Sequence, residues 1–181
     1  MAKFYPAITS RLQQFIEAQK IFFVATAPTN GRINLSPKGM DSFRVISPNR
    51  VLWLNVTGSG NETAAHLIEN NRITIMFCSF EGAPNILRLY GIGKEIKPND
   101  TKWNDVASLF PELPGARQIY DIEIESAQTS CGMSIPYYEY VGERNQLNDW
   151  AIEKGKEGIK AYWKEKNQTS IDGFPTNILS N

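Results

Sequence analysis

"IFFVATAPTNGRINLSPKG", residues 21–39, is the stretch that decides the fold. It begins with β-branched and aromatic residues, passes through Asn30-Gly31, and continues as a second extended run that ends near Lys38. An Asn-Gly pair suits the type I′ turn, whose twist matches that of two antiparallel strands. The stretch therefore predicts a β-hairpin with its turn at Asn30-Gly31.

Further strands are predicted downstream of this hairpin, because short β-branched and aromatic runs alternate with turn residues. These runs are "SFRVIS" (42–47), "RVLWLNV" (50–56), "RITIMFCSF" (72–80) and "ILRLYGIGKEI" (86–96). A long alternating run, "GARQIYDIEIESAQTS" (115–130), adds a seventh strand. Six or seven strands with short connections indicate an antiparallel sheet that closes into a barrel.

Helices are predicted at both ends of the chain and before the last strand. Residues 8–19 carry apolar side chains at helical spacing, with Thr9 and Ser10 as candidate caps. Residues 101–110 and 145–167 show similar spacing, and glycines interrupt the second of these segments. No composition shift marks a linker between folding units. We therefore expect one domain over residues 1–181, mainly β, with peripheral α-helices and a helical C-terminal extension at 145–167.

Composition excludes several classes of partner. The 19 basic and 19 acidic side chains give a net charge of zero, which argues against nucleic-acid binding. No apolar run approaches the roughly 20 residues of a membrane span, so we expect a cytoplasmic protein that binds no membrane. One histidine and two distant cysteines make a metal site or a disulfide scaffold improbable.

The stretch "NVTGSGNETAAHL", residues 55–67, connects a predicted strand to a short helix. Gly58 and Gly60 remove side chains where the backbone turns. Polar groups surround the start of the helix: Ser59, Asn61 and Thr63. Backbone N–H groups and the helix dipole at such a turn can hold a phosphate, although the spacing and the missing lysine do not fit a P-loop. A polar loop with an N-cap explains the same residues, so spacing alone leaves both interpretations open.

A positive charge lies close by in the sequence. The predicted strand that carries Asn34 and Ser36 ends at Pro37-Lys38-Gly39, which leaves the Lys38 ammonium at the mouth of a loop. Lys38 could balance a phosphate, with Ser36 as a hydrogen-bond partner. A lysine beside proline and glycine is more often a solvated turn residue, so this assignment needs support from elsewhere in the chain.

Taken in order, these motifs resemble the pyridoxamine 5′-phosphate oxidase-related, FMN-binding split-barrel family, in particular a short subgroup of about this length. The resemblance rests on "NLSPKG" (34–39), "NVTGSGNETAAHL" (55–67), "SCGMSIPYY" (130–138) and, more weakly, "NQTSIDGFPTN" (167–177). It covers most of the chain, from about Leu12 to Thr176. The fold expected from residues and resemblance together is a six- to seven-stranded antiparallel split β-barrel.

The resemblance also implies a homodimer with FMN in a groove at the subunit interface, each site using both chains. It implies that the cofactor contacts Asn34, Ser36, Lys38, Asn55, Thr57, Gly58, Ser59, Asn61 and Thr63. The glycine turn would cradle the flavin phosphate. Lys38 would replace the lysine of a P-loop, helped by Arg32 or by a basic residue of the partner chain.

The activity that the resemblance implies is an FMN-dependent oxidoreductase acting on an unidentified small-molecule substrate or electron donor. Two alternatives stay open: a non-catalytic flavin or heme binding protein on the same fold, and a pyridoxamine 5′-phosphate oxidase. Oxidases of the family hold their substrate with a C-terminal arginine and histidine, whereas this chain ends "DGFPTNILSN". Glu62 stands where the larger enzymes place a basic residue. His66 and Cys131 are expected to pack or to form a turn, and no catalytic residue is assigned.

Overall fold

The computed structural model describes residues 2–180, which form eight β-strands and four α-helices. The strands are β1 (Lys3–Tyr5), β2 (Phe22–Thr26), β3 (Asn34–Lys38), β4 (Phe43–Ser47), β5 (Arg50–Val56), β6 (Arg72–Cys78), β7 (Ile86–Ile96) and β8 (Ala116–Ser130). The helices are α1 (Ser10–Ala18), α2 (Glu62–Glu69), α3 (Trp103–Ala107) and α4 (Gln146–Lys166). All seven predicted strands are present, and β1 is one that the sequence analysis did not anticipate.

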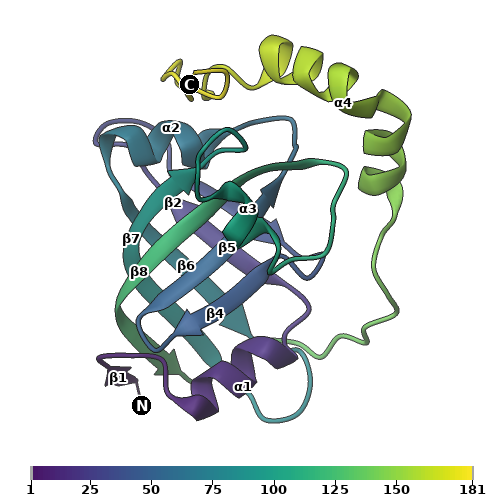
Figure 1. Cartoon of the computed structure of the whole chain (residues 1–181). Coiled ribbons are helices and arrows are strands. Elements are labelled where there is room, and N and C mark those ends of the chain that lie inside the picture. The colour runs from purple at the N-terminus through teal and green to yellow at the C-terminus, as the bar shows by residue number, and fades with distance from the viewer. Residues whose placement is uncertain (1, 181) are drawn as a thin grey trace.

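The strands make one strongly curved antiparallel sheet in the order β3-β2-β6-β7-β8-β5-β4, with β1 paired to β8 (Figure 1). The predicted mainly β split barrel with peripheral helices is confirmed. The sheet does not close, however, because β3 and β4 end the path without pairing to each other. Met40 and Asp41, with φ of 65° and 52°, turn the chain between these two strands. The backbone there leads β4 to the edge of β5 instead of to β3.

The hairpin of β2 and β3 is confirmed, but its turn is not the predicted one. The register runs from Phe22 opposite Lys38 to Thr26 opposite Asn34, which leaves residues 27–33 as the connection. A type I′ turn would need positive φ at both Asn30 and Gly31, and only Gly31 has it. Pro28 lacks the N–H that would continue the ladder, so pairing stops earlier than the Asn-Gly pair suggested.

The core lies inside the curved sheet. Alternation along β2 buries Phe22, Val24 and Thr26, as expected of a strand with one face on the core. Phe22 packs against the rings of Trp53 and Phe77. Aromatic and β-branched residues of β5, β6 and β8 thus meet in one cluster.

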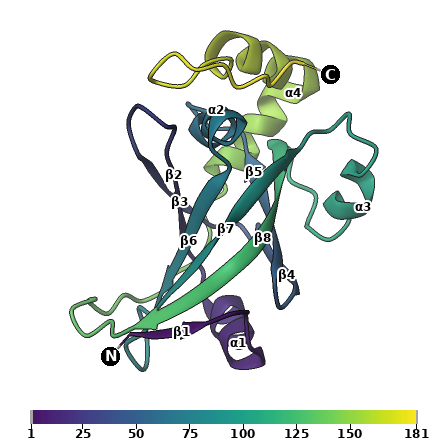
Figure 2. The ribbon, with the colours of Figure 1, turned by 90° about the vertical axis from the view of Figure 1, so that its left-hand side faces the viewer.

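Helices cover the two ends of the sheet. The α1 helix is capped by Thr9, whose Oγ1 accepts from the Leu12 N–H at 3.3 Å, and it lies at the end opposite α2 (Figure 1). The α4 helix bends at Gly155, where φ is 63°, and with the C-terminal residues it lies at the α2 end (Figure 2). Within residues 2–180, no helix is both long and apolar enough to cross a membrane.

Candidate functional site

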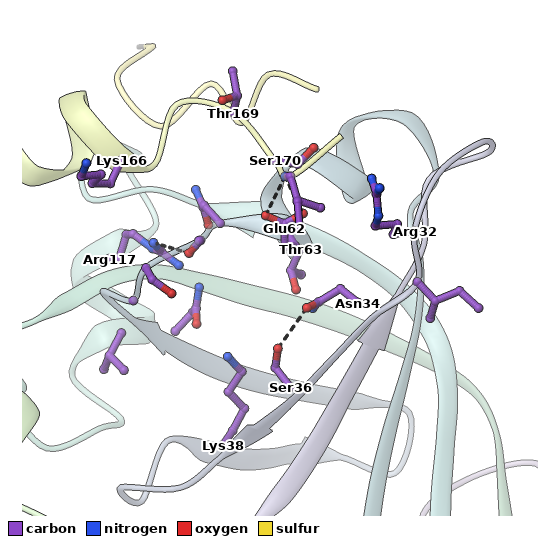
Figure 3. Close-up of a pocket in the computed structure, with 18 of the residues that line it drawn as sticks. Arg32, Asn34, Ser36, Lys38, Glu62, Thr63, Arg117, Lys166, Thr169 and Ser170 are labelled. Carbon is purple, nitrogen blue, oxygen red and sulfur yellow. Dashed lines mark hydrogen bonds between the residues drawn. The ribbon is translucent and has the colours of Figure 1, made fainter. Parts of the chain in front are cut away.

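A pocket of about 650 Å³ lies between β3, β5, the turn before α2, and the C-terminal residues (Figure 3). Eight of the nine residues predicted from the sequence line it: Asn34, Ser36, Lys38, Asn55, Gly58, Ser59, Asn61 and Thr63. Its volume lies within the usual range for small-molecule and cofactor sites. Two motifs that are separate in the sequence therefore form one cavity.

The β3 strand supplies one wall. Side chains at alternate positions share a face of a strand, so Asn34, Ser36 and Lys38 all reach the cavity from β3 (Figure 3). Ser36 Oγ donates to Asn34 Oδ1 at 3.0 Å. This wall therefore presents a polar ladder that ends in an ammonium group.

Thr57 is the one predicted residue that does not line the pocket. Its hydroxyl donates to the Gly115 carbonyl at 3.0 Å and accepts from Trp163 Nε1 at 2.8 Å. Thr57 is buried, and it joins β5 to the loop before β8 and to α4. In this structure Thr57 stabilises the start of the glycine turn through these two contacts, and it does not face the pocket.

The carbonyl groups of the glycine turn are bound by side chains from β8 and from the residue that follows α4. Asn167 Nδ2 donates to the carbonyls of Gly58 and Ser59 at 3.0 and 3.5 Å, and Arg117 Nη1 donates to that of Gly60 at 3.0 Å. Within residues 2–180, no acceptor is bound to the backbone N–H groups of residues 58–61. Free N–H groups before a helix are suited to an anion.

Arg117, on β8, is the main pocket residue that the sequence analysis missed. Its side chain is 3% exposed, and besides Gly60 it binds Asn167 Oδ1 at 2.7 Å and Gln118 Oε1 at 2.9 Å. None of these partners is charged. Burial lowers the pKa of the Arg117 guanidinium. The sequence does hold a signal for this residue. Arg117 and Gln118 stand at the start of a strand that is otherwise apolar on its inner face.

Lys38 is a second cation without an acidic partner. Burial, and after it the nearby charge of Arg117, lowers the pKa of Lys38 from 10.5 to about 8. Its Nζ lies 5.1 Å from the centre of the Trp53 ring, and within residues 2–180 it has no hydrogen bond or ion pair. Two poorly compensated cations in one cavity favour an anionic ligand.

Two buried N–H donors of the pocket also lack acceptors. Asn61 Nδ2 and Trp53 Nε1 make no hydrogen bond with the described part of the chain, and both residues line the cavity. Buried polar groups in native proteins nearly always have a partner. Both nitrogens have almost no accessible surface, so a ligand rich in acceptor oxygens or nitrogens would satisfy them through a small shift of the pocket wall.

Residues 167–176, here called the strap, cross the mouth of the pocket. Thr169 and Ser170, labelled in Figure 3, belong to the lining of the cavity. Ile171 belongs to it as well. The Glu62 carboxylate accepts from the Ile171 N–H at 3.1 Å. Asp172 is paired with Arg32, whose backbone and side-chain hydrogen bonds lower the pKa of the Asp172 carboxyl. The strap is thus fastened to the start of α2 and to the connection between β2 and β3.

Glu62 is the single acidic residue among those that line the pocket, against four basic ones: Arg32, Lys38, Arg117 and Lys166. Its carboxylate is already held by the strap, and His66 Nε2 lies 4.0 Å from it. The net charge of the lining therefore remains positive.

The other residues weighed in the sequence analysis lie outside the cavity. His66 is buried and pairs with Thr26, Nδ1 to Oγ1 at 3.0 Å. Cys78 is buried, and Cys131 is exposed at the end of β8. None of the three lines the pocket. The pocket is therefore lined by hydrogen-bond donors and carries positive charge.

Comparison with known proteins identifies relatives. A family model described as pyridoxamine 5′-phosphate oxidase matches residues 8–131. The pyridoxamine 5′-phosphate oxidase family protein ustO of Aspergillus flavus is 35% identical over 195 residues, covering 97% of this chain and 78% of the relative.

Two solved structures show a similar fold. HupZ of Group A Streptococcus has a TM-score of 0.52 at 19% identity, covering 65% of this chain and 90% of that chain. An FAD binding protein from Mycobacterium smegmatis has a TM-score of 0.50 at 12% identity, covering 70% and 97%. At such identities the likeness concerns the fold alone.

Proposed function

This chain belongs to the pyridoxamine 5′-phosphate oxidase family, as the sequence motifs indicated, and on that premise we propose that its pocket binds FMN. The observation that carries the proposal is a set of donors that have no acceptor within residues 2–180: Lys38 Nζ, Asn61 Nδ2, Trp53 Nε1 and the N–H groups of residues 58–61. FMN offers phosphate oxygens and ring carbonyls, which are acceptors. The donor set therefore fits this cofactor.

Each predicted residue receives a role in the proposal. The N–H groups of the turn and the Lys38 ammonium bind anionic or acceptor groups, and Arg117 holds the turn from behind and adds positive charge. Asn34, Ser36, Asn55, Asn61 and Thr63 supply side-chain hydrogen bonds. Thr57 keeps the turn in place through Gly115 and Trp163.

We further propose that the protein is a flavin-dependent oxidoreductase of a small molecule. A bound flavin supplies hydride transfer, and the protein contributes binding, orientation and electrostatics. The strap contributes Thr169, Ser170 and Ile171 to the lining, and residues 167–176 include no arginine or histidine. This lining supports a substrate other than pyridoxamine phosphate. His66, the only histidine, lies outside the pocket, so heme there would have no histidine ligand from this chain.

The activity is tested by anaerobic stopped-flow reduction of the FMN-loaded protein. We expect NADPH or NADH to bleach the flavin absorption faster than pyridoxamine phosphate does at equal concentration. Faster bleaching by pyridoxamine phosphate would restore the oxidase alternative. FMN binding without bleaching by any of the three would favour a non-catalytic flavin protein.

We also propose that the protein is a cytoplasmic homodimer with the site at the subunit interface. The β3 strand ends the sheet with one edge unpaired, and Leu35 on it is exposed. Exposed strand edges with apolar side chains are normally covered by another chain or element. Sedimentation velocity at low micromolar concentration should give the mass of a dimer, and a monomer alone would reject this part of the proposal.

The affinity for FMN should fall as the pH rises above about 8, because Lys38 then loses its proton. Only the ammonium form attracts an anion, so the dissociation constant should grow by up to about tenfold per pH unit. The phosphate itself is already fully ionised there. Fluorescence titrations at pH 7, 8 and 9 check this for the native chain.

Lys38→Arg is the matched control, since a guanidinium stays charged throughout this range. Its affinity for FMN should be nearly constant between pH 7 and 9. An equal pH dependence in both proteins would show that Lys38 does not face the anionic part of the ligand.

A further inference from the structure

We infer that Gln118, on β8, is a positioning residue that makes Asn61 present its N–H group, and not its carbonyl, to the pocket. This inference rests on the proposed function, because FMN is the ligand that the donor would serve. Gln118 itself does not line the cavity. It acts through Asn61.

The Gln118 side chain is completely buried and makes four hydrogen bonds. Its Oε1 accepts from Arg117 Nε at 2.9 Å and from Asn55 Nδ2 at 3.1 Å. Its Nε2 donates to Glu95 Oε1 at 2.5 Å and to Asn61 Oδ1 at 3.2 Å. A side-chain amide has two N–H donors and an oxygen with two acceptor sites, so this amide is fully used.

The partners fix which way the amide faces. Arg117 has donors only, so it must meet the oxygen of Gln118. Glu95, when ionised, has acceptors only, so it must meet the nitrogen. Turning the amide over would bring N–H against N–H at Arg117 and oxygen against oxygen at Glu95. Two groups of unambiguous polarity thus determine the orientation of Gln118.

The orientation of Asn61 follows from that of Gln118. Because Gln118 Nε2 donates to it, Asn61 must offer Oδ1, and its Nδ2 points elsewhere. Asn61 is 2% exposed and lines the cavity, and its Nδ2 has no acceptor within residues 2–180. A buried N–H without a partner is unfavourable. This nitrogen has almost no accessible surface in the structure, so an acceptor atom of the ligand would remove that cost through a small shift of the pocket wall.

Replacing Glu95 together with Gln118 tests whether Gln118 sets the orientation of Asn61. Glu95 lies on β7 and does not line the pocket, so its replacement leaves the cavity wall intact. Burial raises the pKa of Glu95, and the hydrogen bond from Gln118 opposes that shift. The pair of Glu95 and Gln118 can therefore be exchanged without changing the net charge or the number of side-chain atoms outside hydrogen.

The test is the double variant Glu95→Gln/Gln118→Glu. The introduced carboxylate at position 118 still accepts from Arg117 and Asn55, and it accepts from the introduced amide at position 95. It can only accept from Asn61, so Asn61 must turn its Nδ2 toward position 118 and its Oδ1 toward the pocket. We expect one Asn61 side-chain amide hydrogen to move downfield in the NMR spectrum of the ligand-free protein. Asn61→Ala identifies the signals.

FMN affinity reports the consequence. An acceptor facing the acceptor groups of FMN should weaken binding by about tenfold or more, while the melting temperature stays close to that of the native chain because the hydrogen bonds are conserved. The carboxylate at position 118 also pairs with Arg117 and weakens anion binding by itself, so weaker binding accompanies the Asn61 signals and does not replace them as the readout. Glu95→Gln alone is the control: its side-chain oxygen still accepts from Gln118, so the Asn61 signals should stay at their native positions.

The outcomes separate cleanly. Unmoved Asn61 signals in the folded double variant would overturn the positioning role of Gln118. Moved signals with native FMN affinity would overturn the importance of the Asn61 donor. If the native chain binds no FMN, the proposed cofactor fails, and the Asn61 signals still decide whether Gln118 sets the orientation.

Discussion

Arg117→Met is expected to weaken FMN binding by about a hundredfold or more, equivalent to about 3 kcal/mol. The substitution removes a buried positive charge beside the cavity. It also takes the donor from the Gly60 carbonyl and from Asn167 Oδ1, which link the glycine turn to the start of the strap. Ligand charge and turn geometry are lost together. Titration of the purified variant with FMN, followed by flavin fluorescence, measures the effect.

Arg117→Lys is the matched control for charge. A lysine keeps the positive charge but cannot reproduce the fork of Arg117 that binds Gly60, Asn167 and Gln118 at once. We expect an affinity between those of the native chain and the methionine variant. Native affinity in folded Arg117→Met would contradict the place given to this residue.

Gly91→Ala is expected to destabilise the fold by about 3 kcal/mol. Gly91 lies on β7, where the pairing with β8 shifts its register: Tyr90 pairs with Ser126, and Gly91 pairs with Ile124. A Cβ atom there would overlap the backbone carbonyl of Glu123. Backbone on a central strand cannot move aside as a side chain can, so the longest strand pair of the sheet would have to shift. Chemical denaturation of the native and variant chains measures the difference.

Gly93→Ala, two residues further along β7, provides the comparison. Its Cβ would meet Leu67 Cδ1 at 3.0 Å, the end of a flexible side chain. We expect a loss of stability of at most about 1 kcal/mol. Similar losses in the two variants would show that the close approach of Gly91 to β8 is not what makes this position sensitive.

The strands could be predicted because local pattern and tertiary burial agree along them. In β2, for example, the same residues that favour a strand also alternate between core and surface. The turn and the closure of the sheet were predicted wrongly for particular reasons. Pro28 ends the hairpin ladder early, and Met40 and Asp41 take up positive φ although neither is glycine. The strand β1 has only three residues, too few for a periodic signal.

The pocket residues were accessible to sequence reasoning where a local motif carried them. Asn34, Ser36 and Lys38 follow the period of a strand. The turn between β5 and α2 is recognisable from its two glycines, Gly58 and Gly60. Arg117 was missed, and the strap entered only as a weak part of the resemblance, because both reach the site from 50 or more residues away along the chain. The partners of Arg117 are a backbone carbonyl and side-chain amides, which leave no charge pattern in the sequence. The charged pair of the strap, Asp172 with Arg32, joins residues 140 positions apart.

The central claim is that the pocket recognises a flavin through its phosphate. Titrating the cofactor-free protein with FMN and, separately, with riboflavin tests it most directly, because the two ligands share the ring system and differ in the phosphate. We predict saturable binding of FMN and at least about a hundredfold weaker binding of riboflavin, since riboflavin leaves the cations and N–H groups of the cradle without an anion. Equal affinity for the two ligands, or no uptake of FMN, would contradict the account.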